Sequence, residues 1–531
     1  MSIVEWNHGA ETWLLPNGAC LECLKAWRGN ELSCGWGDPP ARHLRSLINA
    51  HKAALAATPG ARPRRIDWLT GQAREHTLNR HPGCDRHEVK AMDRKHARGM
   101  LARGDDAHGG MRRLSGGELK HAITGLVDSH IGLVRGITEF RNDSPMSGAS
   151  ARLKPFAGPQ DVEYGHGRSG LPTADRVTAV AEAVERWGAL RPWRGVELVE
   201  ASWIDLGDDA VDPRDFILND EDPDLANWRP YDEAAHYQWV WGWSVRKGAP
   251  VLVPLQLVYF GVSNPLGGRF VYEISNGCAG GGSVGEAALY GLLEVIERDA
   301  FLTSWHSSRL VDKISLNVLN DWARGVIARL SGEGVEVSLL DIGCGLPGHA
   351  VAAEIRDTTG RYLPWISQTA AAHPDPAKAC AAALQEGVAM LGVYDVEERA
   401  KRRQQAEALL MAPETVLTMQ NHAAQGNSPW ALNSKAFRRS GHTIAPARVC
   451  ERDAHELFDE YASATLAHAK DVIVVDQSYT PARERGLHTV KVLAPGLHSM
   501  TFGHKRARLS GDRLKIFAPR REWRMEPHLF P

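Results

Sequence analysis

The 531-residue sequence lacks an excess of charge of either sign, since 62 lysines and arginines stand against 64 aspartates and glutamates. A nearly neutral chain gives no reason to expect a nucleic-acid partner, and the locally basic stretch from Arg94 to Lys120 is typical of solvated surface. The sequence also lacks a run of about 20 apolar residues, and it does not begin with the basic and apolar segments of a signal peptide. We therefore expect a cytoplasmic protein with no membrane partner.

Cysteine is scarce, with eight residues in the chain, and this density excludes a disulfide scaffold. We find no internal repeat of fixed period and no low-complexity tract. What the chain does contain is an irregular interleaving of helix and strand patterns, which predicts an α+β fold of mixed α/β layers. The patterns predict helices over 43–57, 174–190 and 376–411, a strand-turn-strand over 121–145, and strands over 253–261, 269–274, 335–343, 350–357, 471–479 and 488–496.

The first hundred residues contain two short metal-binding patterns. Cys20 and Cys23 form C-x2-C, and Cys84 and His87 form C-x2-H. Two such pairs can supply the closed tetrahedral ligand set of a structural zinc ion, and Cys34 is an alternative ligand. The opposing interpretation is four unconnected residues, because a single C-x2-C is common.

One predicted helix, residues 174–190, has polar residues along an otherwise apolar face. Thr178, Glu182 and Glu185 are spaced four and three residues apart, so they share one side of the helix. Arg186 lies four residues after Glu182, which is the spacing of an ion pair.

A second helix, after the glycine-rich segment SNGCAGGGS (275–283), repeats this pattern with Glu286, Glu294 and Glu297, followed by Arg298. Carboxylates at the border of a core are expensive to bury unless they are paired or bind a metal. A solvated face explains one such helix, but two helices with the same E-x2-E-R ending favour a shared site.

The glycines of this second segment allow two interpretations. Gly280, Gly282 and Gly285 fit G-x-G-x-x-G, which in a Rossmann fold binds a dinucleotide. The glutamates of the following helix would repel a bare pyrophosphate, but they suit a triphosphate neutralised by Mg²⁺. The spacing therefore favours a site for Mg²⁺ and ATP.

These motifs resemble the YcaO family, and within it the cyclodehydratase (D-protein) branch of thiazole and oxazole peptide biosynthesis. The family pattern S-x3-E-x2-E-R matches the first helix, with Thr178 in place of serine. Its pattern S-N-G-x-A-x-G followed by E-x7-E-x2-E-R-D matches the second segment, from Ser275 to Asp299. Further likeness lies in LVDSHIGLVR (126–135), APGLHSMTFGH (494–504), the C-x2-C and C-x2-H pairs, and the chain end PHLFP.

The sequence departs from the family pattern at several positions. Gly282 replaces the usual asparagine, and Leu529 replaces the middle proline of the terminal P-x-P-x-P. The helix over 376–391 lacks the arginine that often precedes its glutamate or glutamine, unless Lys378 substitutes for it.

The resemblance implies a YcaO-type ATP-binding fold over residues 121–531, preceded by a smaller zinc-stabilised docking domain over 1–120. It implies that ATP and Mg²⁺ are held by Thr178, Glu182, Glu185, Glu286, Glu294 and Glu297. Arg186 and Arg298 would orient phosphate or brace the carboxylates, and the carboxy-terminal tail ending at Pro531 would help to order the catalytic groups.

The activity implied is ATP-dependent conversion of Cys, Ser or Thr in a ribosomally made precursor peptide into thiazolines or oxazolines, as in the biosynthesis of antibiotic microcins and other modified peptides. The expected partners are the precursor peptide, a separate leader-binding protein of E1-like or related type, and a flavin-dependent azoline oxidase, within a homodimer or a larger synthetase complex. Two alternatives stay open: a YcaO enzyme that forms thioamides or macroamidines, and a zinc-bearing docking scaffold with a weakened nucleotide site.

Overall fold

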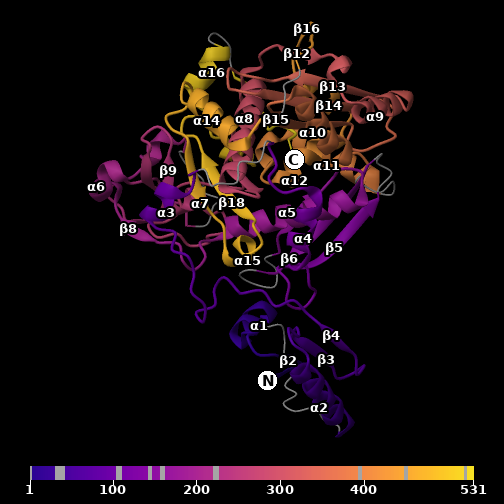
Figure 1. Ribbon diagram of the computed structural model, residues 1–531. Helices are drawn as coiled ribbons and strands as arrows, with labels where there is room; N and C mark the ends of the chain where they lie inside the picture. Colours follow the sequence, from indigo (N-terminus) through magenta and orange to yellow (C-terminus); the bar gives the residue numbers. More distant parts are fainter. Residues whose placement is uncertain are drawn as a thin grey trace.

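The computed structural model describes residues 3–29, 42–102, 110–141, 146–155, 162–218, 227–392, 398–447, 452–518 and 523–530. These residues form a small amino-terminal lobe and a larger body, and Figure 1 shows the lobe below the body. The mixture of helices and sheets confirms the predicted α+β class. Within the described ranges, no helix has both the length and the apolar character needed to cross a membrane.

The lobe is a four-stranded antiparallel sheet in the order β1-β2-β3-β4, with two helices. The predicted helix over 43–57 is confirmed as α2, which buries Ile48 and Leu55 against Leu14 and Ile66 of the sheet. The elements of the lobe are β1 (Val4–His8), β2 (Glu11–Leu15), α1 (Leu21–Arg28), α2 (Arg42–Ala57), β3 (Arg64–Asp67) and β4 (Ala73–Glu75).

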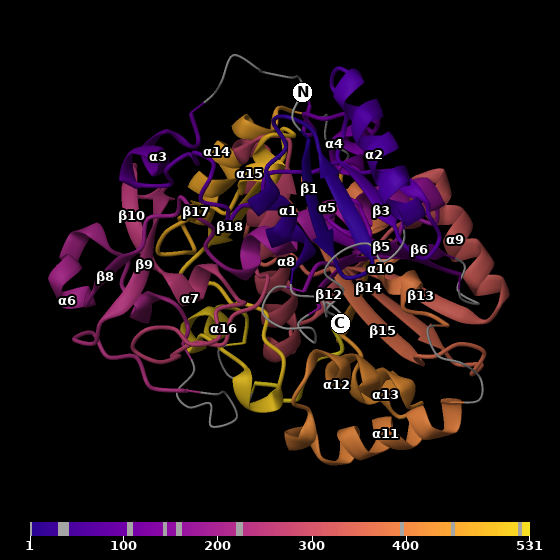
Figure 2. The same ribbon diagram turned by 90° about the horizontal axis from the view of Figure 1, so that it is seen from below.

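The body contains three further sheets. Figure 2, seen from below, shows the six-stranded and five-stranded sheets on opposite sides of the body, behind the lobe. The three-stranded sheet is β5 (Val134–Arg141), β6 (Ser147–Leu153) and β7 (Tyr164–Gly167). The six-stranded sheet runs β10 (Ala249–Pro254), β9 (Tyr237–Ser244), β17 (Ile473–Asp476), β18 (His488–Leu493) and β11 (Cys278–Gly281), with β8 (Val199–Ala201) paired to β9. The five-stranded sheet runs β15 (Ile366–His373), β14 (His349–Asp357), β13 (Val335–Asp341), β12 (Val311–Ile314) and β16 (Arg439–Ile444).

Helices fill the space between these sheets and cover their outer faces. They are α3 (Arg94–Gly99), α4 (Gly116–Thr124), α5 (Pro172–Leu190), α6 (Trp203–Leu206), α7 (Leu255–Val258), α8 (Val284–Ser307), α9 (Asp321–Gly332), α10 (Pro376–Ala389), α11 (Arg399–Met411), α12 (Met419–Ala424), α13 (Ala431–Ser434), α14 (Ala454–Thr465), α15 (Thr480–Arg483) and α16 (Gly511–Phe517).

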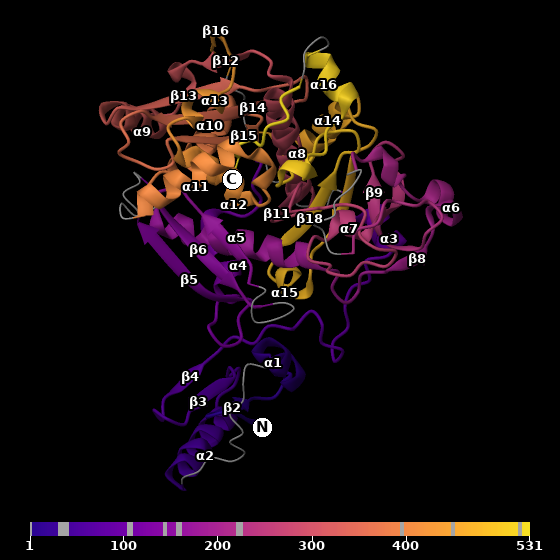
Figure 3. The same ribbon diagram turned by 180° about the vertical axis from the view of Figure 1, so that it is seen from behind.

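Helix α8 lies at the centre of the body and is buried on nearly every side. It packs on β11 and β18 of the six-stranded sheet and on β14 and β15 of the five-stranded sheet, and Figure 3 shows it between the two. Helix α5 packs between the three-stranded sheet and β11 and β18, while α10 covers β14 and β15. At Gly277 a Cβ atom would lie 2.1 Å from the carbonyl oxygen of Val492, so the segment before α8 lies close against β18 only because it carries no side chain there.

Several predicted elements are confirmed, including the antiparallel pair over 335–343 and 350–357, which is β13 and β14. The prediction of a strand over 269–274 is wrong, because this segment forms no ladder and the N–H of Phe270 donates instead to the Gln256 side chain (3.0 Å). The strand over 253–261 ends at Pro254, which has no N–H to donate, and α7 follows.

Two helix boundaries also differ from the prediction. Residues 121–124 belong to α4, because Ser115 and Glu118 form a capping box that starts a helix there; the second predicted strand of this segment is present as β5. The helix predicted over 376–411 is divided into α10 and α11, and Gly392 after α10 has a positive φ of 70°, which ends the helical run.

Candidate active site

Helix α5 carries the first group of predicted site residues, and its start is firmly held. Pro172 opens the helix, and the buried Asp175 in its first turn accepts hydrogen bonds from Ser169 and from Ser147 (2.8 Å). A Cβ atom at Gly167 would lie 1.9 Å from the carbonyl oxygen of Asp175, so β7 lies directly against the helix. The first turn of α5 is therefore held in place, and with it the glutamates two turns further along the helix.

Glu182 and Arg186 form an ion pair at the predicted spacing. The Arg186 guanidinium donates from Nε (3.1 Å) and Nη2 (2.7 Å) to Glu182 Oε1, and from Nη1 to Glu163 (2.5 Å). The second Glu182 oxygen accepts the backbone N–H of His166 (2.5 Å). Although burial opposes its charge, these two carboxylates raise the pKa of Arg186, so it stays a cation.

Helix α8 carries the second group. Arg298 forms an ion pair with Glu294 and donates from Nη1 to Asn276 Oδ1 (2.6 Å). Glu297 accepts the backbone N–H of Ala372 in β15. The other Glu294 oxygen, Oε2, is buried and has no hydrogen-bond partner among the described residues.

A further glutamate, Glu386 of α10, joins this group. Arg168, from the loop between β7 and α5, donates to its Oε1 (3.2 Å). Glu386 also raises the pKa of Glu297 through its negative charge, which places the two carboxylates near each other. Neither Glu386 nor Arg168 was predicted as a site residue from the sequence; the one signal was the family pattern over 376–391, which includes a glutamate or glutamine.

We call Glu182, Glu185, Glu294, Glu297 and Glu386 the carboxylate cluster. Burial raises the pKa of four of them, and neighbouring glutamates raise it further: Glu294 and Glu182 act on Glu185, Glu386 and Glu294 on Glu297, and Glu182 on Glu386. Clustered carboxylates that repel one another are stabilised by a bound cation, and Mg²⁺ takes hard oxygen ligands. The orphaned Glu294 Oε2 fits such a ligand set.

A pocket lies beside Arg298, the partner of Glu294, and is lined in part by Asn276, Arg298 and Ser499; the cluster glutamates themselves do not line it. Arg298 Nε, like Glu294 Oε2, is buried without a hydrogen-bond partner among the described residues. Both atoms belong to one ion pair and have hydrogen-bonding capacity left for a charged ligand.

Two predicted site residues lie apart from the cluster. Glu286 is two turns before Glu294, about 12 Å along the helix axis. It is nearly fully buried, and its oxygens accept from Arg112 Nη1, from the N–H of Arg113 and from the N–H of Gly282, each at 3.0 Å. Thr178 is exposed on α5. Both assignments to ATP or Mg²⁺ remain predictions.

The contacts of Glu286 also explain how the glycines before α8 are packed. The N–H of Gly282 is taken by Glu286, and a Cβ atom at Gly282 would lie 2.9 Å from Leu114 Cγ. The residues around 113–114 therefore cover this end of the helix, and the absence of asparagine at 282 follows from that packing. The strand expected just before the glycines, over 269–274, is also absent, so the Rossmann interpretation fails.

The carboxy-terminal tail, residues 523–530, packs on the body, and its last four residues, 527–530, are buried. Trp305 Nε1 donates to the carbonyl of Glu526 (2.9 Å), and Lys435 Nζ donates to that of Pro527 (2.8 Å). The ring of Phe530 lies 4.9 Å from that of Phe301, which is one turn beyond Glu297 on α8. Pro531 lies outside the described residues, so its catalytic role remains a prediction.

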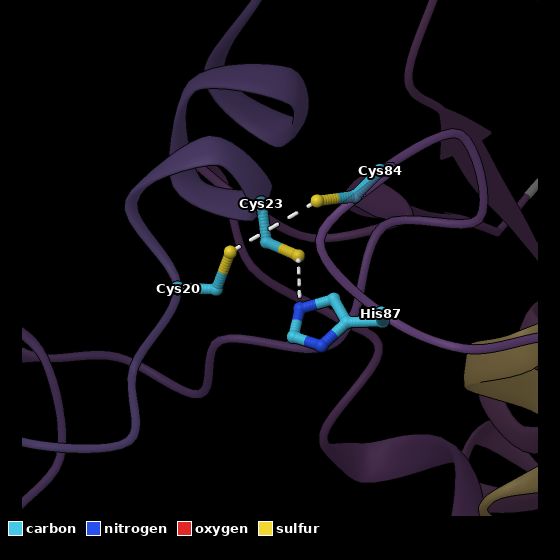
Figure 4. Close-up of side chains that lie close together, drawn as sticks. All are labelled: Cys20, Cys23, Cys84 and His87. Carbon is cyan, nitrogen blue, oxygen red and sulfur yellow. Dashed lines mark hydrogen bonds between the residues drawn. The ribbon is translucent and has the colours of Figure 1, made fainter.

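The four predicted zinc ligands meet in the lobe. Each offers one ligand atom, and the four atoms lie within 4.8 Å of one another (Figure 4). Cys20 Sγ and Cys84 Sγ are 3.9 Å apart, while a tetrahedral zinc with Zn–S bonds near 2.3 Å separates its sulfurs by about 3.8 Å. His87 Nε2 lies 3.2 Å from Cys23 Sγ. This group can hold a metal ion, and zinc as that ion is our proposal; the alternative ligand Cys34 lies outside the described residues.

Clustered carboxylates with arginine partners are typical of enzymes that bind a phosphate-bearing substrate through a divalent cation. More specifically, the chain belongs to the YcaO family: the family model described as YcaO cyclodehydratase, ATP- and Mg²⁺-binding, matches residues 166–498, more than half of the chain. This range contains the whole cluster.

The individual relatives are distant. An uncharacterized protein of Methanothermobacter thermautotrophicus is 29% identical over 238 residues, and the match spans 44% of this chain and 58% of that relative. The solved structure of a heterocyclase in complex with substrate and cofactor has a TM-score of 0.73 at 18% identity, covering 93% of this chain and 72% of the other. The heterocyclase TruD has a TM-score of 0.62 at 16% identity, covering 96% and 74%. At these identities the two structures establish the shared fold.

Proposed function

We propose that this protein is an ATP-dependent peptide cyclodehydratase that forms thiazolines or oxazolines. The observation that carries the proposal is the carboxylate cluster: five glutamates from α5, α8 and α10 lie together, with arginine partners, in a chain of the YcaO family. Intact carboxylates on all three helices support turnover rather than a decayed scaffold.

The reaction joins two activations. A Cys thiol or a Ser or Thr hydroxyl of the peptide loses its proton and adds to the preceding amide carbonyl, which makes an oxyanion. That oxyanion attacks the γ-phosphorus of ATP, and ADP departs. Loss of the amide proton and of phosphate then leaves the ring with a C=N bond. The net change in the peptide is the loss of one water.

The residues of this chain would act by position and charge. When bound, Mg²⁺ would neutralise charge between the carboxylates and the triphosphate. Glu294 and Glu297 would supply ligand oxygens to the ion. Arg186 bridges Glu182 and Glu163, and Arg298 bridges Glu294 and Asn276, so the two arginines hold the carboxylates in fixed orientation. The tail would complete the site from the side of Phe301.

We propose that a separate protein delivers the precursor peptide, and that the metal group of the lobe belongs to a docking domain. The precursor, a leader-binding partner, an azoline oxidase and assembly as a dimer or larger complex follow from the family resemblance. Direct affinity of this chain alone for the precursor leader tests the partner: tight binding without any second protein contradicts it.

The test of the function is the loss of one water per ring from a candidate precursor, followed by mass spectrometry with this protein, ATP and Mg²⁺, with and without a candidate partner. Glu294→Ala and Glu182→Ala should abolish ring formation, while Glu200→Ala, at an exposed position of strand β8, should leave it unchanged. Full ring formation by both cluster variants would remove the proposal.

A further inference from the structure

Arg168, Arg186 and Arg298 pair with glutamates of the carboxylate cluster. The guanidinium groups of Arg186 and Arg298 are already occupied by several bonds to protein groups. Arg186 uses three nitrogens on Glu182 and Glu163, and Arg298 is divided between Glu294 and Asn276. Such guanidinium groups brace carboxylates and have little capacity left for a ligand.

Arg168 differs from these two. Among the described residues its guanidinium has one bond, from Nη1 to Glu386 Oε1 at 3.2 Å. The side chains of Arg168 and Glu386 are 28% and 33% exposed, so the pair is partly solvated and its attraction is weak. A guanidinium has five N–H donors, and the remaining four of Arg168 are available to an anion.

The position of Arg168 is fixed by the loop that carries it. Gly167 before it lies against Asp175, and Ser169 after it donates from both its backbone N–H and its hydroxyl to the Asp175 carboxylate. The arginine therefore leaves a rigid turn at the start of α5 and reaches across to α10. A donor held this way loses little entropy when a ligand binds.

Helix α10 supplies no cation of its own at this point. Ala382 stands one turn before Glu386, and Lys378 stands two turns before it, exposed and acting on His373. An arginine from another element therefore occupies the place that α10 leaves without a positive charge.

We propose that Arg168 contacts the γ-phosphate of the bound nucleotide, so that it is a catalytic residue of this enzyme. The inference rests on the proposed function and names one residue of that same site. Phosphate oxygens take two parallel N–H bonds from one guanidinium, and charge on these oxygens is what the transfer of the phosphoryl group redistributes. Arg168 would leave Glu386 to the cation and turn its donors to the phosphate.

The test compares ligands with and without the γ-phosphate. Arg168→Gln should weaken binding of the non-hydrolysable ATP analogue AMPPNP with Mg²⁺ by about 10–100-fold, the loss of one charge-assisted bidentate contact, and should leave the affinity for ADP with Mg²⁺ unchanged. Ring formation should fall by about 100-fold or more. Arg168→Lys should recover part of both losses, because it keeps the charge without the fork. Calorimetry and single-turnover mass spectrometry give these readouts.

Arg176→Gln is the matched control, since this arginine lies on the outer face of α5 and pairs with Glu139. It should bind both nucleotides as the unsubstituted protein does. An equal loss of AMPPNP and ADP affinity in Arg168→Gln indicates a structural role and overturns the inference, as does no loss of either. Failure of the unsubstituted protein to bind any nucleotide overturns the proposed function instead, so the two failures are distinguishable.

Discussion

The charge of Glu297 has opposite effects on stability and on the proposed function. Burial and the charges of Glu386 and Glu294 raise its pKa well above that of a free glutamate, so its ionised form destabilises the protein without a cation. A glutamine in its place removes that repulsion and also removes a ligand oxygen that carries charge.

We predict that Glu297→Gln raises the Tm of the ligand-free protein by roughly 1–3 °C, the shift that about 1 kcal/mol produces in a large domain. The same change should abolish the stabilisation that Mg²⁺ and AMPPNP give to the unsubstituted protein. Thermal unfolding with and without ligand measures both. Glu407→Gln, a helix glutamate paired with Arg403 on α11, is the control. A lower Tm in Glu297→Gln together with full ligand stabilisation would contradict this role.

The raised pKa values also predict a pH dependence. Where a carboxyl group has a higher pKa in the folded state, the folded protein binds more protons, and stability falls as pH rises from the unfolded pKa through the folded one. Glu185, Glu294, Glu297 and Glu386 all shift in this direction. The ligand-free protein should therefore lose stability as pH rises above about 4.5, and Mg²⁺ with AMPPNP should raise Tm more at pH 8 than at pH 6. A ligand effect of equal size at both pH values would count against the cluster as the cation site.

For single residues, the sequence could predict which side of each helix carries the glutamates. It could not predict that α5, α8 and α10 bring these glutamates together. The spacing of Glu182 and Glu185, and of Glu294 and Glu297, follows from helical periodicity, and α5 and α8 confirm both helices. Glu386 lies nearly ninety residues after Glu297, and Arg168 lies before α5 in a turn. No local period relates them, so only the tertiary fold reveals that they share a site.

Among the segments of the chain, the carboxy-terminal tail is held in place by residues that are distant from it in sequence. Residues 523–530 form no helix or strand, so their backbone groups bond to the body, as the N–H of Arg524 does to the carbonyl of His306 in α8. Lys435 is nearly fully buried, burial lowers its pKa to about 8, and its ammonium donates to the carbonyl of Pro527. Next to it, the His422 ring lies 4.5 Å from the His528 ring in a tilted arrangement. Burial lowers the pKa of His422 to about 3 and that of His528 well below its usual value, so this ring pair is neutral near pH 7.

We predict that Lys435→Met loosens the tail while the body stays folded. The substitution keeps the volume of the side chain but leaves the Pro527 carbonyl buried without its donor, a loss of about 1.5–3 kcal/mol. Hydrogen exchange over 523–530 should accelerate by roughly 10–100-fold, and ring formation should slow while AMPPNP affinity is kept. Lys515→Met, an exposed lysine on α16, should change neither quantity. Unchanged exchange in Lys435→Met would show that the other tail contacts suffice.

Segment 269–274 is a second case in which the backbone contacts could not be predicted from the sequence. The segment 269–274 has the apolar character of a buried strand, and Phe270 and Val271 are indeed buried. Its backbone nevertheless forms only one isolated bridge, at Arg269, and the N–H of Phe270 donates to the Gln256 side chain. The hydrophobicity of the segment predicted its burial. Its backbone hydrogen bonds could not be predicted, because one of them is made to the side chain of Gln256, which lies 14 residues earlier in the chain.

For the whole molecule, the decisive contact is the one between the lobe and the body. Trp27 of α1 follows the ligand Cys23 by one turn, and its ring lies 4.6 Å from His81 and 6.2 Å from Trp187 at the end of α5. Trp187 in turn stacks on Trp193 at 5.2 Å. Arg194 donates to the carbonyls of Cys84 and His87 at 2.6 Å each. The metal group therefore lies close to the carboxy-terminal end of α5, the helix that carries Glu182 and Glu185.

The division of the chain at residue 120 remains a prediction, and the contacts of residues 94–124 bear on it. Helix α3 packs on β9 and β10, and α4 packs on α5. Arg112 and Arg113 contact Glu286 of α8. By these contacts the segment after the second metal pair belongs with the body, so we expect the lobe to behave as a unit that ends before α3.

The metal group should then stabilise this contact as well as the lobe. Without the ion, α1 keeps the packing of Leu24 and Trp27, but Trp27 loses part of what fixes it against Trp187. We predict that Cys84→Ser loses the bound metal, measured as about one zinc per chain in the unsubstituted protein by elemental analysis, and accelerates hydrogen exchange in α1 and over 187–194. Cys380→Ser, which removes a buried thiol in α10 far from the group, should keep the metal and the slow exchange of α1. If exchange over 187–194 stays slow in Cys84→Ser while α1 opens, the aromatic contact holds the end of α5 by itself, and the metal acts within the lobe alone.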